Sequence, residues 1–327
     1  MTFPRVLREH AGTLSTVALV VTWSSGFVGA ELGSRAGAAP LTLLGWRFVL
    51  LALLLVTVAR LRRTPWPRWQ AWRRQIVLGL LCQAAYLLLV FEGVTHGVPG
   101  GTAALIASLQ PLLVATVAGS LLGERTTARM WLGMLLGLGG VTVVVSGDLS
   151  IAGAPLWAYA LPVVGMLCLA GGTVLERRLK PVETLLETIM MQAVVTAVVL
   201  MTLAVAFGQA TPPASVEFWQ AVLWLIVLAS LGGYVMYVFV ARTRGATVVS
   251  TLLFLTPPTT MLWVYLMFGE AVTLVALVGL AISGVGVWLV LGGRRTEVNP
   301  PSLRGPVREP SLRRDRRSAA QRLLRSG

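Results

Sequence analysis

The sequence predicts an all-α membrane protein with ten transmembrane helices, arranged as two inverted five-helix repeats with both termini in the cytoplasm. Its 327 residues are 56% hydrophobic and only 12% charged, and their mean hydropathy is +0.78. A soluble globular enzyme does not have this composition. Two further observations support this prediction: the chain contains apolar runs long enough to cross a bilayer, and its second half repeats part of its first half.

Ten apolar runs follow one another along the chain, each bounded by Arg, Pro, Gly or Thr clusters. Because bilayer hydrocarbon is about 30 Å thick, a spanning helix needs about 20 mostly apolar residues. The runs cover residues 13–32, 40–59, 76–94, 101–122, 130–147, 155–175, 184–207, 218–241, 246–268 and 271–293. The first run resembles a signal peptide in position, but it contains Trp23 and Ser24 and lacks a clear cleavage site, so we expect an uncleaved first helix.

The basic residues predict the orientation of these helices. With a cytoplasmic N-terminus, 25 of the 27 Lys and Arg residues fall on the inner side, leaving Arg35 outside and Arg47 within a span. This is the distribution that the positive-inside rule requires of a multi-pass protein of the plasma (inner) membrane. The net charge of +14 therefore reflects topology and does not indicate a nucleic-acid partner. Cys82 and Cys168 lie in apolar runs, where we expect core packing and no disulfide.

Residues 294–327 form a basic tail, which we expect to be disordered and cytoplasmic. It contains ten Arg residues and four prolines, which prevent a long helix. Two interpretations stand side by side: an extension of the inner anchor with no further role, or a clamp on anionic lipids.

An internal repeat divides the chain into two units. Residues 109–147 align without a gap on residues 255–293, with ten identities in 39 positions, several of them Pro, Gly or Glu. We therefore expect five-helix repeats at 13–147 and 153–293. Because five is odd, the second unit enters the bilayer in the opposite orientation. Inverted repeats of this kind are typical of alternating-access transporters.

The repeat resembles the EamA-type transporters of the drug/metabolite transporter superfamily. The resemblance rests on Trp23-Ser-Ser-Gly-Phe27 in the first helix, Arg47 in the second, and Pro111 or Pro257 followed by Gly-Glu-x-x-Thr. It covers about residues 13–293. It implies a ten-helix carrier, usually an exporter of amino acids or related small metabolites, with a central cavity among helices 1, 3, 4, 6, 8 and 9 and with helices 5 and 10 at the periphery.

Polar and aromatic side chains on the cavity helices are the candidate substrate-binding residues. They can hydrogen-bond an amphipathic solute and stack on its apolar part, although Trp and Tyr near helix ends are also common interfacial anchors. The candidates are Trp23, Ser24, Phe27, Gln83, Tyr86, Gln110, Tyr234 and Tyr237.

Two prolines in mirrored spans are candidate hinges. Pro111 and Pro257 each remove an amide donor and clash with the preceding turn, so we expect kinks with freed carbonyl groups. The alternative is a packing kink without a gating role. In the Gly-Glu-x-x-Thr motifs that follow, Thr127 and Thr273 are expected to cap the next helix.

Arg47 and Glu92 are the candidate charge-coupling residues. A charged side chain near mid-bilayer costs about 2.5 to 3.5 kcal/mol on insertion scales, so it usually faces the bundle interior with a partner. The two residues can pair with each other; alternatively, Arg47 extends outward and Glu92 faces outside water. The second repeat has Gln192 near the place of Arg47, so any role of this charge is asymmetric.

Small residues follow one face of helices 5 and 10 at Gly133, Gly137 and Gly140 and at Gly279, Ser283 and Gly286. Such faces allow close helix approach. Packing within each repeat is the first expectation, and a homodimer through helices 5 and 10 is the alternative.

The sequence contains no nucleotide-binding loop, zinc motif or serine-hydrolase motif, so no cofactor or metal is expected and the chain is not predicted to be an enzyme. The predicted function is secondary-active export of small organic metabolites, such as amino acids or related compounds, by alternating access. A membrane-embedded ligand-binding sensor or a lipid-acting enzyme is the alternative. The expected partners are a small-molecule substrate and the lipid bilayer.

Overall fold

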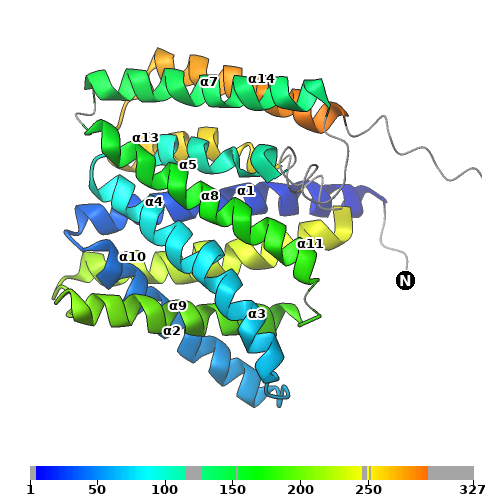
Figure 1. The fold of residues 1–327 in the computed structure, drawn as a ribbon, viewed down its shortest axis with the longest axis vertical. Helices are drawn as coiled ribbons and strands as arrows, with labels where there is room; N and C mark the ends of the chain where they lie inside the picture. Colours follow the sequence, from blue (N-terminus) through cyan, green and yellow to red (C-terminus); the bar gives the residue numbers. More distant parts are fainter. Residues whose placement is uncertain are drawn as a thin grey trace, which may run out of the picture. The chain divides into compact units, whose positions relative to one another are not determined.

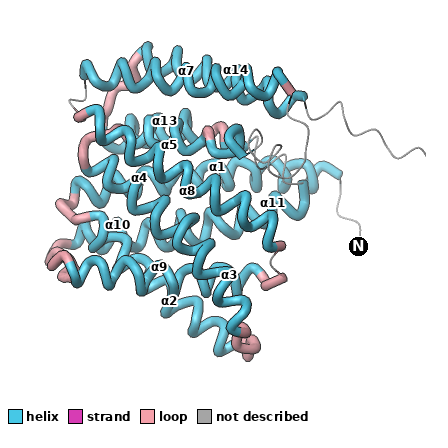
Figure 2. The backbone as a smooth tube through the Cα atoms, viewed as in Figure 1, coloured by secondary structure: helices cyan, strands magenta, loops and turns pink. Residues whose placement is uncertain are grey.

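The computed structural model describes residues 5–114, 127–151, 154–180, 182–244, 249 and 252–293, and the described residues are helices joined by short loops (Figure 2). The expected basic tail at 294–327 lies outside the described residues, as do Glu124 and parts of the fourth and ninth predicted spans.

The helices of the first repeat fall on the predicted runs, but the first helix begins at Arg5 and the third at Trp69, before the expected starts at residues 13 and 76. They are α1 (Arg5–Arg35), α2 (Pro40–Leu61), α3 (Trp69–Gly79), η1 (Leu80–Ala85), α4 (Tyr86–Thr95), α5 (Gly100–Ser108) and α7 (Ala128–Ile151). The third run is one helix of three parts, because η1 is a π-helical turn that separates α3 from α4. The sequence pattern did not predict this turn.

The second repeat has the same order of elements. Its helices are α8 (Leu156–Leu179), α9 (Leu185–Ala206), α10 (Val216–Trp224), η2 (Leu225–Gly232), α11 (Gly233–Arg244), α13 (Thr256–Phe268) and α14 (Leu274–Gly293). A π-helical segment, η2, again lies in the third helix of the repeat. The two halves therefore share their local irregularities as well as their helix order.

Seven of the described helices are long and apolar enough to cross a membrane, and two shorter apolar helices cover Gly100–Val114 and Leu274–Leu289. The seven span candidates are Leu14–Arg35, Pro40–Leu61, Trp69–Thr95, Ala128–Leu149, Leu156–Leu179, Leu185–Ala206 and Val216–Tyr237. The chain is thus an all-helical, multi-pass membrane protein, and the count of ten spans remains a prediction.

Helices α7 and α14 pack antiparallel on one side of the bundle (Figure 1). A Cβ atom added at Gly140 would lie 2.4 Å from the carbonyl oxygen of Gly279, and one added at Gly286 would lie 2.4 Å from that of Gly133. Between these contacts, the Ser283 hydroxyl donates to the carbonyl of Gly137 at 3.1 Å. The expectation that these small faces pack within each repeat holds for Gly137, where an added Cβ atom would meet Leu109 and Leu112 of the same repeat. It was wrong for Gly140, Gly279 and Gly286, which lie against the helix of the other repeat. A homodimer through these two helices would have to use their other faces.

Helices α2 and α9 form a second antiparallel pair on the other side (Figure 1). The Thr42 hydroxyl near the start of α2 donates to the Gln209 carbonyl just after α9, at 2.6 Å. Gly45 lies against Met201. Between the two pairs lie α1, α4, α5, α8, α10, α11 and α13 (Figure 1).

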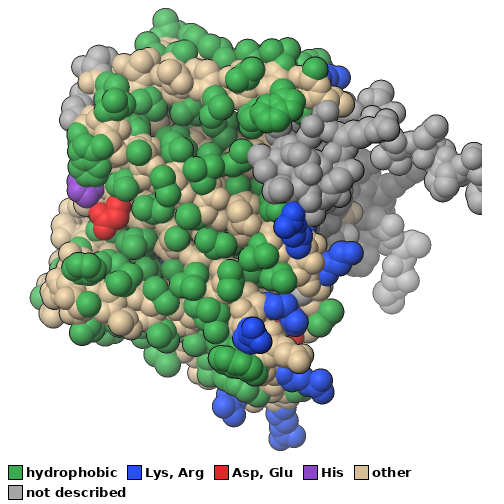
Figure 3. All heavy atoms as spheres, in the orientation of Figure 1, with side chains coloured by type: hydrophobic (Ala, Val, Ile, Leu, Met, Phe, Trp, Pro, Cys, Tyr) green, Lys and Arg blue, Asp and Glu red, His purple; other side chains and the backbone are tan. Residues whose placement is uncertain are grey.

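Charge is concentrated at the two ends of the helices. Lys and Arg side chains gather along one edge of the view in Figure 3, and acidic and histidine side chains lie at the opposite edge, with apolar side chains between. We call the first edge the arginine-rich face; it is the end of the bundle where α2 ends, α3 begins and α8 ends (Figure 1), and these helix ends carry Arg60, Arg62, Arg63, Arg68, Arg73 and Arg177. The caps expected from the repeat motif are present: Thr127 accepts from the Met130 amide and Thr273 from the Ala276 amide.

Candidate functional site

A small pocket lies between the two repeats. Its volume is about 40 Å³, which is room for a few water molecules but not for an organic solute. The first repeat contributes Trp23, Phe27, Tyr86, Ala104, Ala107, Ser108, Gln110 and Pro111, and the second contributes Leu169, Leu253 and Thr256. Five of the predicted site residues, Trp23, Phe27, Tyr86, Gln110 and Pro111, therefore line one common pocket.

Helix breaks border this pocket at both predicted hinges. The helix α5 ends at Ser108, Leu109 forms a turn, and a new helical segment that contains Pro111 follows. Pro257 likewise lies in the first turn of α13, after a turn at 254–255. The expectation of kinks inside continuous spans needs correction: each proline lies in a first turn, where its missing amide hydrogen costs no helical hydrogen bond. Whether the breaks act as hinges stays a prediction.

Buried hydroxyl groups near the break in the second repeat lack partners. The hydroxyls of Thr256 and Thr260 are buried and have no hydrogen-bond partner, and Thr256 lines the pocket. A buried unpaired hydroxyl costs about 1 to 3 kcal/mol, so such groups are unusual without a functional reason. Thr256 was not among the sequence candidates, because a threonine in an apolar run gives no signal of this kind.

The remaining candidate substrate-binding residues lie outside the pocket lining. Trp23 stacks on Tyr237 with ring centroids 5.5 Å apart, and the Gln83 side-chain amide donates to the Tyr234 hydroxyl at 3.2 Å. Ser24 is fully buried and donates to the carbonyl of Val20 at 2.7 Å. These four candidates, Ser24, Gln83, Tyr234 and Tyr237, are not among the residues that line the pocket.

Gln83 also belongs to a chain of polar contacts between the repeats. The Gln83 amide lies 3.5 Å from Gln192 on α9, and the Gln192 amide donates to Gln75 at 2.9 Å. Gln75 in turn contacts Glu183, which forms an ion pair with Arg74. The chain thus runs from Tyr234 in the interior to the loop between α8 and α9.

Glu183 at the end of this chain is a carboxylate stabilised by its neighbours. Burial raises its pKa, but hydrogen bonds from Arg74 and Gln75 and the positive charge of Arg74 outweigh that effect, so the pKa lies below the usual range. Glu183 is therefore ionised at neutral pH and holds α3 of the first repeat against the second repeat.

On the opposite face, Arg35 links the end of α1 to the loop after α13. It forms ion pairs with Glu31 and Glu270, and its guanidinium lies 4.3 Å from the centre of the Phe268 ring. Glu270 follows Gly269, whose φ of 72° ends α13 in a left-handed conformation that glycine adopts readily. Ion pairs thus join the two repeats at both faces of the bundle.

Arg47 and Glu92 do not pair with each other in this structure. Arg47 is 6% exposed and donates to the Ser230 hydroxyl in η2 from Nε at 3.3 Å and from Nη2 at 3.0 Å. Glu92 is half-buried and lies 3.7 Å from the ring nitrogen Nδ1 of His96. The two candidate charges therefore occupy separate surroundings, and neither of the sequence alternatives describes Arg47, which stays inside the bundle.

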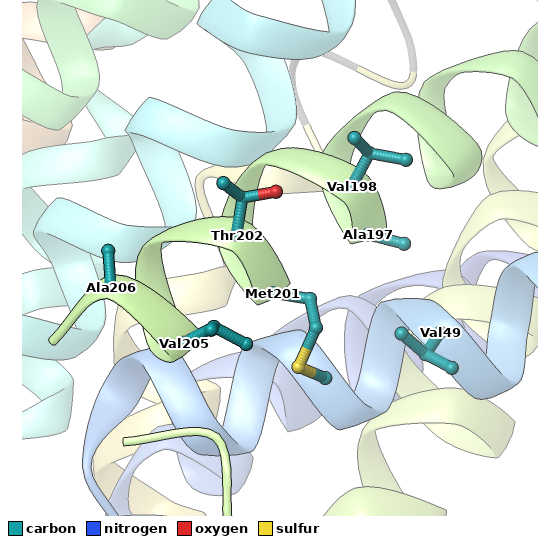
Figure 4. A pocket seen from close by; sticks show the side chains of 7 residues that line it. All are labelled: Val49, Ala197, Val198, Met201, Thr202, Val205 and Ala206. Carbon is teal, nitrogen blue, oxygen red and sulfur yellow. The ribbon is translucent and has the colours of Figure 1, made fainter. Parts of the chain in front are cut away.

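A second and larger hollow lies on the outside of the bundle (Figure 4). It is a shallow groove along α9, with Val49 of α2 at its edge, and its volume is about 600 Å³. Its side chains are almost entirely apolar: Val49, Ala197, Val198, Met201, Thr202, Val205 and Ala206. A groove without convergent polar groups on a lipid-facing surface suits acyl chains, so we place the candidate substrate site in the smaller pocket between the repeats.

Comparison with known proteins agrees with this architecture. Residues 10–146 and 156–292 each match the EamA-like transporter family. The chain belongs to the EamA-like transporter family. The two matched segments coincide with the two structural repeats, and the relatives of this chain are named as transporters and not as enzymes.

Individual relatives are similar over most of their length. The "Uncharacterized inner membrane transporter YedA" of Escherichia coli K12 is 26% identical over 279 residues, 85% of this chain and 89% of that protein. A "Probable terminal-alkyne amino-acid exporter" of Streptantibioticus cattleyicolor is 28% identical over 297 residues, 88% of this chain and 97% of that protein. A solved crystal structure with 21% identity superposes with a TM-score of 0.62 over 88% of this chain and 99% of its own, which shows a shared fold.

Proposed function

We propose that this EamA-family transporter is a secondary carrier of the plasma membrane that exports small organic metabolites, such as amino acids or related compounds, by alternating access. The observation that supports this best is the pocket between the repeats. Both repeats line it, so a movement of one repeat against the other changes its size and its access.

The size of the pocket supports a conformational cycle. At about 40 Å³ it holds no metabolite in this conformation, so substrate binding needs the helices around it to separate. The helix breaks before Pro111 and Pro257 border the pocket, where the backbone is not held by continuous helical hydrogen bonds. Rotation at these breaks would widen the site without unfolding a helix.

The chemistry of the lining supports an amphipathic solute. Trp23, Phe27 and Tyr86 offer aromatic surface, and Gln110 and Thr256 offer hydrogen-bonding groups. The relative named as an amino-acid exporter is consistent with such a substrate. An enzyme that acts on lipids is not supported, because the relatives are named as transporters.

Profiling of extracellular metabolites tests the proposal. Cells that make the intact protein are compared with cells that make Trp23→Leu, which removes an indole ring from the pocket, and with Trp288→Leu as the matched control. Trp288 lies on the outer surface of α14 and is 65% exposed. We expect a small set of metabolites to accumulate outside at least several-fold more with the intact protein and with the control than with Trp23→Leu.

The proposal fails if Trp23→Leu exports as well as the intact protein, or if no metabolite distinguishes expressing from non-expressing cells. Equal amounts of folded protein in the membrane are confirmed first. Imposing a pH gradient on proteoliposomes that contain the exported compound then tests whether protons drive the export.

A further inference from the structure

Arg47 carries a buried positive charge, and the side chains that its guanidinium contacts are neutral. Its guanidinium donates to the Ser230 hydroxyl and lies 4.9 Å from the centre of the Phe48 ring. Among the described residues no carboxylate forms an ion pair with it, and of the charged helical residues whose burial the structure describes, Arg47 is the only buried one. An uncompensated charge in a bilayer is costly, so a buried arginine normally has an anionic partner.

The surroundings of Arg47 place it beside the pocket between the repeats. Ser230, the hydrogen-bond acceptor of Arg47, lies in the π-helical segment η2 and donates to the Leu225 carbonyl five residues earlier at 3.0 Å. The helix that contains η2 packs against the part of α1 that carries the pocket residue Trp23: a Cβ atom added at Gly26 would lie 3.7 Å from that of Ala229, and one added at Gly233 would lie 3.7 Å from the Trp23 ring. Such π-helical turns inside α-helices are frequent at functional sites.

The second repeat shows that the fold does not require a cation at this position. Gln192 occupies the corresponding place on α9 and contacts Gln83 in η1, just as Arg47 on α2 contacts Ser230 in η2. The neutral contact holds α9 against η1 without any charge. Packing of the second helix on the π-helical turn is therefore possible with glutamine, and the charge of Arg47 needs another explanation.

We propose that Arg47, together with Ser230, binds the carboxylate group of the transported compound. This inference rests on the proposed function and narrows its substrates to organic acids, zwitterionic amino acids included. The hydrogen bonds to Ser230 use Nε and Nη2 of Arg47. A guanidinium has five N–H donors and binds carboxylates in a bidentate geometry, so donors remain for a carboxylate. Because one cation is buried there, a single negative charge is neutralised, which favours a carboxylate over a doubly charged phosphate.

Paired ligands test the carboxylate directly. The purified full-length protein is heated with L-leucine or L-leucinamide, and with L-phenylalanine or L-phenylalaninamide, so that each pair differs only in the carboxylate. We expect the acids to raise the unfolding temperature at concentrations at least tenfold lower than the amides do. In Arg47→Gln, which copies the second repeat, this preference disappears.

Further variants separate binding from folding. Arg47→Lys keeps the positive charge but cannot form a bidentate contact, and Ser230→Ala keeps the guanidinium but removes the neighbouring hydroxyl. We expect both variants to fold and to bind the acids several-fold more weakly. Arg60→Gln is the matched control, because Arg60 is on the same helix but lies exposed over Trp66. It should bind the acids as the intact protein does.

Several results would overturn the inference. The first is equal stabilisation of the intact protein by acids and amides, and the second is stabilisation by neither. The third is that Ser230→Ala and Arg47→Lys weaken the binding of acids and amides equally, which is the result expected of a purely structural arginine. Export of compounds that lack a carboxylate would overturn it while leaving the proposed function intact. Failure of every variant and of the intact protein to export anything would instead contradict the proposed function.

Discussion

At the scale of single residues, the unpaired hydroxyl groups separate a binding role from a structural one. Thr256 and Thr196 both bury a hydroxyl without a partner, but Thr256 lines the pocket between the repeats, whereas Thr196 lies on α9 and does not. Replacing either with valine removes the unpaired group and keeps the side-chain shape. Each variant should gain about 1 kcal/mol in free energy of unfolding, since an unsatisfied hydroxyl costs about 1 to 3 kcal/mol.

Transport distinguishes the two variants. Thr256→Val should lose export several-fold despite its higher stability, because the hydroxyl is then missing from the site, and Thr196→Val should export normally. Denaturant unfolding and export of the same compound measure both quantities. If Thr256→Val gains stability and keeps full export, then the hydroxyl does not contact the substrate.

The residues of the pocket were only partly predictable. Aromatic and amide side chains in apolar runs are unusual, so Trp23, Tyr86 and Gln110 could be selected from the sequence. Thr256, Ser108 and Leu169 could not, because their side chains are ordinary in membrane helices and only the packing of distant helices brings them to the pocket. The partner of Arg47 was also beyond prediction, since Ser230 is 183 residues away.

At the scale of helices, the seam between α7 and α14 holds the two repeats together at one side. A methyl group at Gly140 would lie 2.2 Å from the Ser283 hydroxyl and 2.4 Å from the backbone of Gly279. The hydroxyl can rotate away, but the Gly279 carbonyl and the Ser283 amide nitrogen, which would lie 2.7 Å from the methyl group, cannot move without separating the helices. Gly140→Ala should therefore lower the free energy of unfolding by about 1 to 3 kcal/mol, the usual cost of overpacking a tight interface.

The neighbouring glycine supplies the control. A methyl group at Gly139 meets nothing within 4 Å, so Gly139→Ala should leave stability unchanged or slightly higher. Thermal unfolding of both variants in the same detergent makes the comparison. Equal stability of the two would mean that the seam is not as close as the structure has it.

The positions of the helices were predictable, because the length of an apolar run and the charges that flank it determine them locally. The antiparallel direction of α7 and α14 agrees with the predicted inverted repeat. The π-helical turns η1 and η2 were not predictable, since a π turn needs only one additional residue in a helix and leaves the apolar pattern intact. Which small faces meet depends on long-range packing. The sequence therefore predicted small faces at Gly140 and Gly279 but assigned them to the wrong partners.

At the scale of the whole molecule, the predicted topology can be tested with the loops that the structure describes. Arg74 and Glu183 join the repeats near the arginine-rich face, and Arg35 and Glu270 join them at the opposite face. If the arginine-rich face is cytoplasmic, as the positive-inside rule predicts, then the loops at 62–68 and 182–184 lie inside and those at 207–215 and 269–273 lie outside.

Labelling of single cysteines in intact cells measures on which side of the membrane each loop lies. In a protein that carries Cys82→Ala and Cys168→Ala, a cysteine at exposed Gln209 should react with a membrane-impermeant maleimide, and one at exposed Val182 should react only after the cells are opened. The two positions flank the same helix, α9, so one experiment fixes its direction. Labelling of the cysteine at position 182 from outside would mean that the whole bundle has the opposite orientation in the membrane. The conclusion extends to the whole bundle because α9 packs on α2 and α14 packs on α7, so both repeats share one orientation. Such labelling would then place the arginine-rich face outside, against the charge distribution, and would reverse the direction in which the pocket must open for export.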